Sequence, residues 1–495
     1  AARERLAALG FRDPVVALRH LEALTVGVSR RAAIQRTLLP VMLGWFADEA
    51  DPDAGLLAFR RVSDELGSIH WYLKMLRDEG SSAERLAHVL GRSRYVADLL
   101  VRSPESVAFL GDATGLAPSS RADLTATMTS AAGRRHDPDL AIAAVQSVRR
   151  HELLRIAFGD LVGGLSLREV GRALTDLTAA TFEAALQIAT RVVAAQHDGV
   201  LGTRMLVVGM GSLGGSEMGY GSDADVLFVH EPEEGVEENE AQARALQAVQ
   251  ELIRLLGAAG SAPPLGVSAE LRPEGRNGPL VRSLESYRAY YERWALTWEF
   301  QALLRAAPVA GDLGLAGRFV ALIEPVRWPE GGISARQVRD IRTLKARVEA
   351  ERLPRGADPR THFKLGRGGL TDVEWTVQLL ALRHGYAHPA LRTTSTMEAL
   401  DAAESEGLIT PGHARDLREG WTLAQSLRNA AVLWRGRSLD SLPTDLRDAD
   451  GVGRIIGRPP GRGADLAETY LRVARRCRLA MDLNFYLPDT AGTVG

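Results

Sequence analysis

Apolar residues recur every three or four positions through most of the first 163 residues, which is the spacing of amphipathic helices. Residues 13–24 open with Asp-Pro, a frequent helix start, and residues 140–164 keep the helical pattern until it ends at a pair of glycines. The longest pattern covers residues 166–196, and its opening Ser-x-x-Glu has the spacing of a capping box. The pattern predicts a helical N-terminal region.

The pattern changes at Arg204. Residues 204–210 and 225–230 are short, Val-rich apolar runs bounded by Gly or Pro, so they are predicted strands. Residues 264–273 are a third candidate strand, residues 241–260 predict a helix before it, and helical spacing then resumes almost to the end of the chain. We therefore expect a mixed α and β protein that is mostly helical and carries one small sheet.

The length of 495 residues fits about three domains. From the changes in pattern we expect an N-terminal helical domain at 1–163, a sheet-containing domain at 164–325 and a C-terminal helical bundle at 326–495. The chain starts with AARERLAALGF, without an initiator methionine and without an apolar segment behind it. Such a start is expected for a piece of a longer chain and not for a secretory signal.

Charge and cysteine content narrow the functional classes. With 60 Lys and Arg against 62 Asp and Glu the net charge is -2, so the chain as a whole has no attraction for nucleic acid. No apolar run approaches the roughly 18 residues that a membrane span needs. Cys477 is the only cysteine, which excludes an intramolecular disulfide and is typical of a reducing cytoplasm. We expect a cytoplasmic protein that binds neither nucleic acid nor a membrane.

An aromatic stripe follows the third candidate strand and consists of Leu284, Tyr287, Tyr291, Trp294 and Trp298. Successive members are three or four residues apart, so they share one face of a helix. We expect this face to pack in the core, and a base-stacking platform is the alternative.

The loop between the first two predicted strands is the main candidate for chemistry. It contains Gly209-x-Gly211-x-x-Gly214 after an apolar run, the fingerprint of dinucleotide binding, and Glu231 lies about 20 residues further on, where such sites carry an acid. A dinucleotide site also needs a helix directly after the glycines. The segment that would form it contains several glycines, and each costs about 1 kcal/mol relative to alanine. A dinucleotide-dependent oxidoreductase is therefore the weaker interpretation.

The same loop fits phosphate and metal binding better. Gly211 and Ser212 can offer backbone N–H groups to phosphates. Asp223 and Asp225 are separated by one residue at the start of a predicted strand, so their side chains leave the same face. Paired carboxylates suit Mg²⁺, which takes its other oxygens from water and substrate phosphates. This arrangement of Gly-Ser and Asp-x-Asp resembles the signature of the polymerase-β-like nucleotidyltransferases.

A neighbouring strand usually supplies a third acid to such a site. Residues 264–273 contain Ser268 and Glu270, which are two apart and therefore share a face of the predicted strand, and only Glu270 is a carboxylate. Arg272 on the same face is a candidate phosphate ligand. A solvent-facing glutamate and an ordinary salt bridge are the structural alternatives for Glu270 and Arg272.

Three longer segments resemble the glutamine synthetase adenylyltransferase family: residues 209–231, 271–312 and 345–380. That family is bifunctional. One nucleotidyltransferase unit adds AMP to a tyrosine of glutamine synthetase, and a second unit removes it by phosphorolysis. The segments, including GYGSDAD and FKLGRGGL, are most similar to the C-terminal, adenylylating unit in its actinobacterial form. The resemblance implies a polymerase-β-like nucleotidyltransferase domain flanked by helical domains.

The resemblance also assigns roles by position. Asp223 and Asp225 would be catalytic and would bind metal, and Glu270 would complete the set if it replaces the family's third acid. The family usually has Lys or Arg where this chain has Ser212, and Asp where this chain has Ser268. The nucleotide-binding residues would be Gly211, Ser212, Gly214, Gly215, Ser222 and Arg272.

Four further residues match the family, but their side-chain types alone do not indicate a function: Lys364, Arg367, Asp372 and Glu374. We expect them to support the helical domain, and contact with the nucleotide is the alternative. His384 and His388 are spaced as on a zinc-binding helix, but Gly385 and Pro389 interrupt that helix and no third ligand follows, so a zinc site is not expected.

These features together predict transfer of AMP from ATP to a tyrosine of glutamine synthetase, with ATP as substrate and two Mg²⁺ ions. Glutamine synthetase and the other half of the chain are the expected partners, and a PII-type signal protein is a further candidate. Two alternatives within the family stay open. The chain could be the deadenylylating unit, or it could be a catalytically silent regulatory half, because Ser268 stands in place of an acid.

Overall fold

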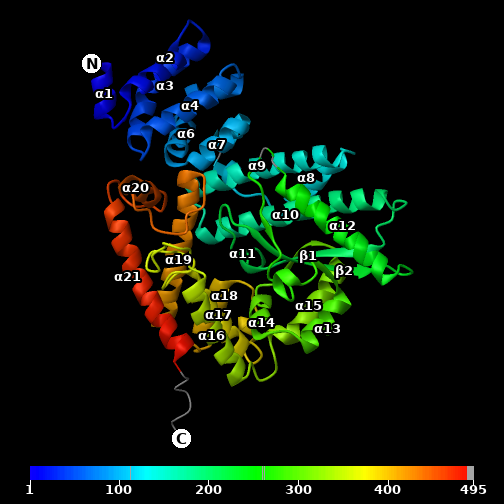
Figure 1. Cartoon of the computed structure of the whole chain (residues 1–495). Helices are drawn as coiled ribbons and strands as arrows, with labels where there is room; N and C mark the ends of the chain where they lie inside the picture. Colours follow the sequence, from blue (N-terminus) through cyan, green and yellow to red (C-terminus); the bar gives the residue numbers. More distant parts are fainter. Residues whose placement is uncertain (112, 259, 261, 488–495) are drawn as a thin grey trace. The chain divides into compact units, whose positions relative to one another are not determined.

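The computed structural model describes residues 1–111, 113–258, 260 and 262–487, and helices make up most of it, as expected (Figure 1). The chain packs as two compact units, each built from three stretches of sequence. Unit 1 contains Ala1–Ser119, Arg149–Ala173 and Ser426–Glu468, and unit 2 contains Ser120–Val148, Leu174–Gln425 and the segment from Thr469 onward. The three consecutive domains expected from the sequence do not coincide with these two units, and that division of the chain stays a prediction.

Unit 1 is helical, as the apolar spacing predicts for the N-terminal region. The Asp-Pro start is a true helix cap, because the Asp13 side chain accepts a hydrogen bond from the Val16 N–H. Its elements are α1 (Ala2–Ala8), α2 (Pro14–Thr25), α3 (Arg30–Ala47), α4 (Pro52–Leu66), α5 (His70–Asp78), α6 (Gly80–Arg92), α7 (Arg94–Arg102), η1 (Pro104–Gly111), η2 (Ala113–Leu116) and α20 (Leu446–Ile455).

Four long helices contribute residues to both units: α9 (Pro138–Val162), α10 (Leu167–Ala195), α19 (Pro411–Arg435) and α21 (Gly463–Met481). The capping box at the start of α10 is confirmed. The Ser166 hydroxyl accepts from the Glu169 N–H at 3.3 Å, and the Glu169 carboxylate accepts from the Ser166 N–H at 2.7 Å. Further along α10, within unit 2, Glu183 accepts from the Gly311 N–H at 2.8 Å and so ties this helix to an edge of the sheet.

The sheet of unit 2 has the strand order β3-β2-β1-β5, and β4 also pairs with β2. β1 runs antiparallel to β2 and β5, whereas β3 and β4 run parallel to β2. The first two strands lie close to their predicted bounds. The third is much shorter than 264–273, and the last two were not predicted. The strands are β1 (Thr203–Gly209), β2 (Ala224–Pro232), β3 (Val267–Ser268), β4 (Val281–Ser283) and β5 (Ala307–Gly311).

Helices cover both faces of this sheet, with α12 on one face and α13 and α15 on the other. None of the helices in the described part of the chain is both long and apolar enough to cross a membrane. The remaining elements of unit 2 are α8 (Arg121–Gly133), α11 (Gly211–Gly214), α12 (Glu238–Gly257), η3 (Gly275–Asn277), α13 (Leu284–Arg293), α14 (Thr297–Leu303), α15 (Leu313–Arg327), α16 (Ala335–Glu351), α17 (Leu370–His384), η4 (Pro389–Leu391), α18 (Thr396–Ser405) and the π-helical turn η5 (Asp482–Tyr486).

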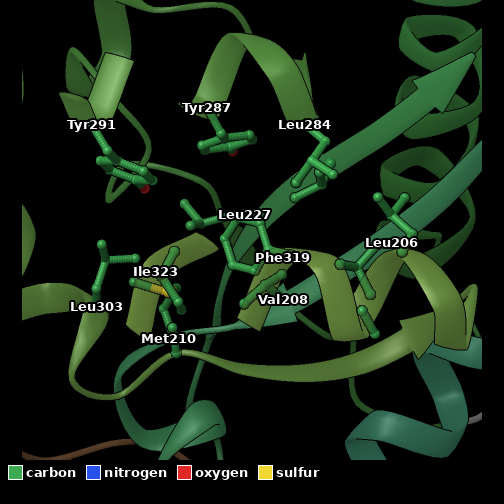
Figure 2. Close-up of a cluster of buried hydrophobic side chains, with 14 residues drawn as sticks. Leu206, Val208, Met210, Leu227, Leu284, Tyr287, Tyr291, Leu303, Phe319 and Ile323 are labelled. Atoms are coloured by element: carbon green, nitrogen blue, oxygen red, sulfur yellow. The ribbon is translucent and has the colours of Figure 1, made fainter. Parts of the chain in front are cut away.

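Apolar side chains on one face of β1 and β2 pack against α13 and α15 (Figure 2). Tyr287 and Phe319 meet edge to face in this cluster, with ring centroids 5.5 Å apart. The first three residues of the aromatic stripe are buried here, as expected, but Trp294 is 72% exposed because α13 ends at Arg293. This core fixes β1 and β2, whose adjacent ends carry the candidate loop.

Candidate functional site

The candidate loop joins β1 to β2 within unit 2. At the end of β1 the Met210 N–H donates to the carbonyl of Asp225 at 2.8 Å, and the chain then turns into α11, which has only four residues. Gly211 begins this turn with φ of +52°, a region that favours glycine. The first N–H groups of any helix have no partner within the helix, and Met210 supplies no side-chain cap. The turn therefore offers backbone donors beside the start of β2.

The direction of the strands excludes the dinucleotide interpretation. A dinucleotide-binding unit has two parallel strands joined by a helix that faces the pyrophosphate. Here β1 and β2 are antiparallel, and the helix between them is the single turn α11. Glu231, the acid of that interpretation, lies near the opposite end of β2, where it pairs with Arg204 and Arg318.

Arg305 packs against the two glycines at the end of the turn, Gly214 and Gly215. A methyl group on Gly214 would lie 1.8 Å from the carbonyl oxygen of Arg305, and one on Gly215 would lie 2.5 Å from a guanidinium nitrogen of the same residue. Neither position has room for a side chain. These glycines allow the candidate loop to lie directly against the residues that precede β5.

Two serines shape the rest of the loop through short-range hydrogen bonds. The Ser212 carbonyl accepts from the Glu217 N–H at 2.9 Å, and the Ser222 hydroxyl accepts from the Gly219 N–H at 3.2 Å. The Ser222 turn immediately precedes Asp223. The sequence-predicted loop residues are thus all part of one compact turn, and their contact with a nucleotide stays a prediction.

Asp223 and Asp225 flank Ala224 where β2 begins. Ala224 is buried, whereas Asp223 is exposed and Asp225 partly exposed, which fits side chains that leave the same face. Two glycines make room for the carboxylates. A methyl group on Gly211 would lie 3.1 Å from a carboxylate oxygen of Asp225, and one on Gly266 would lie 2.1 Å from a carboxylate oxygen of Asp223. The absence of side chains at these two glycines therefore lets the backbone approach both carboxylates closely.

The electrostatics at Asp225 favour a bound cation. Burial raises the pKa of the Asp225 carboxyl, and the charges of Asp223 and Glu270 raise it further. The Ser268 hydroxyl, which bonds to this carboxylate from the paired position on β3, and the charge of Lys364 act in the opposite direction. Two carboxylates together with substrate phosphates are a usual ligand set for Mg²⁺, so the residues present fit that metal.

The predicted third acid lies beyond the end of its strand. β3 stops at Ser268, so Glu270 occupies the following turn and does not share a strand face with it; there its half-exposed carboxylate pairs with Arg276. Within the described ranges, no three acidic, histidine or cysteine side chains form a group that could hold a metal. Asp223 and Asp225 are the carboxylates that lie side by side, and the role of Glu270 stays a prediction.

Arg272 holds this turn together. Its guanidinium donates to the carbonyls of Ala269 at 2.7 Å, Gly278 at 3.0 Å and Arg276 at 3.0 Å. These bonds close the turn soon after β3, which explains why the strand is so short. A contact between Arg272 and a phosphate would require some of these bonds to break, so that role also stays a prediction.

A buried ion-pair cluster beneath the loop was missed by sequence reasoning. Arg305 pairs with Glu217 at 2.6 Å and with Glu374 at 3.1 Å. Burial opposes the charge of Arg305, but the two carboxylates outweigh it and raise the pKa of the guanidinium. Glu217 also accepts from the N–H of Thr396 at 2.6 Å, at the start of α18. The only sequence signal was that Glu217, Arg305 and Glu374 all lie in the segments that resemble the adenylyltransferase family.

The four unassigned positions divide into two kinds. Asp372 is fully buried and pairs with the buried Lys345 at 2.6 Å, which fits the expected support of the helical segment, whereas Glu374 pairs with Arg305 beside the candidate loop, and its role stays a prediction. Lys364 and Arg367, in contrast, are exposed.

Comparison with known proteins agrees with the geometry. Residues 83–321 match the family described as glutamate-ammonia ligase adenylyltransferase, and residues 342–483 match the one described as GlnD PII-uridylyltransferase. The chain is 55% identical over 501 residues to the bifunctional glutamine synthetase adenylyltransferase/adenylyl-removing enzyme of Streptomyces coelicolor, an alignment that covers 98% of this chain and 50% of the relative.

Relatives with the same name occur in other bacteria. The protein from Mycolicibacterium smegmatis is 49% identical over 481 residues, covering 97% of this chain and 48% of the relative. The protein from Leifsonia xyli is 48% identical over 487 residues, covering 98% of this chain and 48% of the relative. This chain spans about half the length of the curated relatives it matches. Over nearly all of its own length, it is therefore similar to about half of a bifunctional glutamine synthetase adenylyltransferase/adenylyl-removing enzyme.

Proposed function

We propose that this chain is a nucleotidyltransferase unit that transfers AMP from ATP to a tyrosine of glutamine synthetase and so lowers its activity. The observation that carries this proposal is the position of Asp223 and Asp225 beside the glycine turn at Gly211, at one end of antiparallel β1 and β2. The names of the relatives support glutamine synthetase as the protein substrate.

The chain's own residues would position the reacting groups. Backbone N–H groups of Gly211 and Ser212 would bind phosphate oxygens, and Asp223 and Asp225 would hold Mg²⁺ against the same phosphates. Bound at these two aspartates, Mg²⁺ would supply positive charge to offset the negative charge that develops during an in-line displacement. Glu270 would be the third acid and would accept the tyrosine proton.

In the proposed transfer, one bond forms and one bond breaks at the α-phosphorus of ATP. The tyrosine oxygen forms a bond to the α-phosphorus of ATP, and the bond from that phosphorus to the bridging oxygen of the β-phosphate breaks. AMP stays on the tyrosine, pyrophosphate leaves, and the phenolic proton passes to a carboxylate. Because a tyrosine hydroxyl has a pKa near 10, removal of its proton needs such a neighbouring base.

Two other functions are candidates, and each has a specific reason. The relatives' name includes adenylyl removal, which the same kind of site could perform by phosphorolysis. Ser268 stands where the resembling family usually has an acid, and loss of that acid is the ground for the other candidate, a catalytically silent regulatory half. The other half of a longer chain and a PII-type protein are proposed partners, the latter because residues 342–483 match a PII-uridylyltransferase family. We propose that the protein and these partners are located in the cytoplasm.

One incubation separates these possibilities. The chain is mixed with Mg²⁺, ATP labelled on the α-phosphate and glutamine synthetase, and the Asp225→Asn variant serves as the matched control. Label on the synthetase with the parent chain alone supports the transferase. Release of label from adenylylated synthetase in the presence of phosphate supports the removing unit, and binding of ATP without either reaction supports the silent half. A chain that neither binds ATP nor transfers label contradicts the proposal.

A further inference from the structure

The loop before α17 is a rigid frame that carries two exposed cations, Lys364 and Arg367. Backbone hydrogen bonds cross it, including Leu370 N–H to the Phe363 carbonyl at 2.8 Å and Thr371 N–H to the Lys364 carbonyl at 3.1 Å. A methyl group on Gly369 would lie 2.5 Å from the Phe363 carbonyl oxygen, so the loop closes on itself without space for side chains. Lys364 is therefore presented from a fixed backbone.

A buried ion pair anchors this loop at its far end. The Asp372 carboxylate accepts from the Gly368 N–H at 2.7 Å and pairs with Lys345 at 2.6 Å, and both partners are at most 1% exposed. Lys345 also pairs with Glu349 at 3.0 Å, and Asp372 also pairs with Arg478 at 3.2 Å, so the anchor is part of a small network of ion pairs. Lys345 thus has a supporting role that Lys364, which is exposed, does not share.

A second ion pair brings the start of α17 to the candidate site. Glu374, in the N-terminal half of α17, pairs with Arg305, and Arg305 packs against Gly214 and Gly215 of the candidate loop. α17 and α18 lie side by side, and Glu217 of the candidate loop bonds to the first residues of α18 (Figure 1). The loop that carries Lys364 is therefore tied to the loop that would hold phosphate. The charge of Lys364 also acts on the Asp225 carboxylate, so the two side chains lie near one another.

Outside the loop before α17, the cations near the candidate site in the described part of the chain are already occupied. Residues 211–222 contain no Lys or Arg. Arg272 is occupied by three carbonyl oxygens, and Arg305 is occupied by two carboxylates. The Lys364 side chain is exposed, and among the described residues its ammonium makes no hydrogen bond or ion pair, which leaves its donors free for a ligand.

We propose that Lys364 binds the β- and γ-phosphates of ATP and neutralises the pyrophosphate as it leaves. This inference rests on the proposed function and extends it, because it supplies from the helical segment the cation that the phosphate loop lacks. A triphosphate brought against Asp223 and Asp225 adds negative charge to a site that is already acidic. An ammonium on a fixed backbone at that place stabilises the charge that develops on the leaving group.

The test measures which part of the nucleotide Lys364 contacts. Binding of ATP, AMP and pyrophosphate, each with Mg²⁺, is measured by calorimetry for the whole chain and for Lys364→Gln, Lys364→Arg and Arg367→Gln. A lost charge-assisted contact should weaken binding of ATP and pyrophosphate about tenfold to a hundredfold in Lys364→Gln, whereas binding of AMP stays unchanged. Lys364→Arg should keep most of the affinity. Arg367→Gln removes an exposed cation from the same loop and should bind all three ligands like the parent chain.

Two outcomes would overturn the inference. One is equal affinity for pyrophosphate in the parent chain and Lys364→Gln. The other is an equal loss of AMP and ATP binding in Lys364→Gln, which would mean that the substitution distorts the loop. The melting temperature of this variant is compared with that of the parent chain, and equal values exclude such a distortion. The readout does not depend on the protein substrate. A chain that binds ATP and pyrophosphate through Lys364 but labels no glutamine synthetase would contradict the proposed function and leave this inference standing.

Discussion

Replacement of Arg305 by Met should strongly destabilise unit 2. Arg305 and Glu217 are each 8% exposed, and their charged groups are 2.6 Å apart. Met keeps most of the side-chain volume and removes the charge, so Glu217 and Glu374 are left facing each other without a counter-ion. Removal of one partner from a buried pair costs about 3–5 kcal/mol. For a unit of this size that corresponds to a fall of about 5–8 °C in melting temperature.

A double-mutant cycle separates the ion pair from simple packing. Glu217→Gln removes the carboxylate charge but keeps an oxygen that can accept from Thr396. The double variant, Arg305→Met with Glu217→Gln, should be more stable than the sum of the two single changes predicts, by about 1–3 kcal/mol. Calorimetric melting of the four proteins gives this coupling.

A surface ion pair between α15 and β2 is the matched control. Arg318 is 43% exposed and pairs with Glu231, so Arg318→Met should change the stability by less than about 1 kcal/mol. Strictly additive effects of Arg305→Met and Glu217→Gln, or a loss from Arg305→Met no larger than that from Arg318→Met, would refute the view that this cluster supports the loop.

The remaining predictions concern the acids and the ligand. Asp223→Asn and Asp225→Asn should each abolish AMP transfer, measured with labelled ATP, and near-normal transfer by either variant would contradict the metal assignment. Because burial and acidic neighbours raise the pKa of Asp225, its ionisation costs stability above that raised pKa. In the absence of Mg²⁺, Asp225→Asn should therefore raise the melting temperature at pH 7, and the gain should vanish as the pH falls below the ordinary value of 3.8. ATP with Mg²⁺ should raise the melting temperature of the parent chain, whereas NAD and FAD should not, since only ligands of the native state stabilise it. Glu270→Gln should lower the transfer rate by at least about tenfold and Ser268→Ala should change it little. A silent Glu270→Gln together with a faster Ser268→Asp would instead indicate a weakened or regulatory unit.

Elements with strong local signals were predictable from the sequence. Residues 166–196 gave the capping box and nearly the full length of α10, and two Val-rich runs gave β1 and β2. Elements that depend on a distant partner were not. β3 is only two residues long and exists because Asp225 pairs with Ser268, and β5 contains Pro308, which reads as a turn in isolation.

The residues of the candidate site differ in the same way, because some follow from the local sequence and others depend on distant partners. The spacing of Asp223 and Asp225 within one strand start is local information, so the sequence placed them together. Arg305 is separated from Glu217 by 88 residues and from Glu374 by 69 residues, and only the folded chain shows that one guanidinium joins both. Lys364 is a similar case, because no local pattern indicates that its charge acts on Asp225.

Ser268 illustrates how a departure from a family pattern can be compatible with an intact site. It lies directly opposite Asp225, so an aspartate there would add a third negative charge next to a carboxyl whose pKa burial already raises. The serine hydroxyl instead donates a hydrogen bond that favours the ionised form of Asp225, the form that binds metal. Mg²⁺ needs only one or two protein carboxylates when substrate phosphates supply further oxygens. Replacement of an acid by Ser268 therefore removes a possible ligand but keeps the aspartate pair in the state that the proposed chemistry requires.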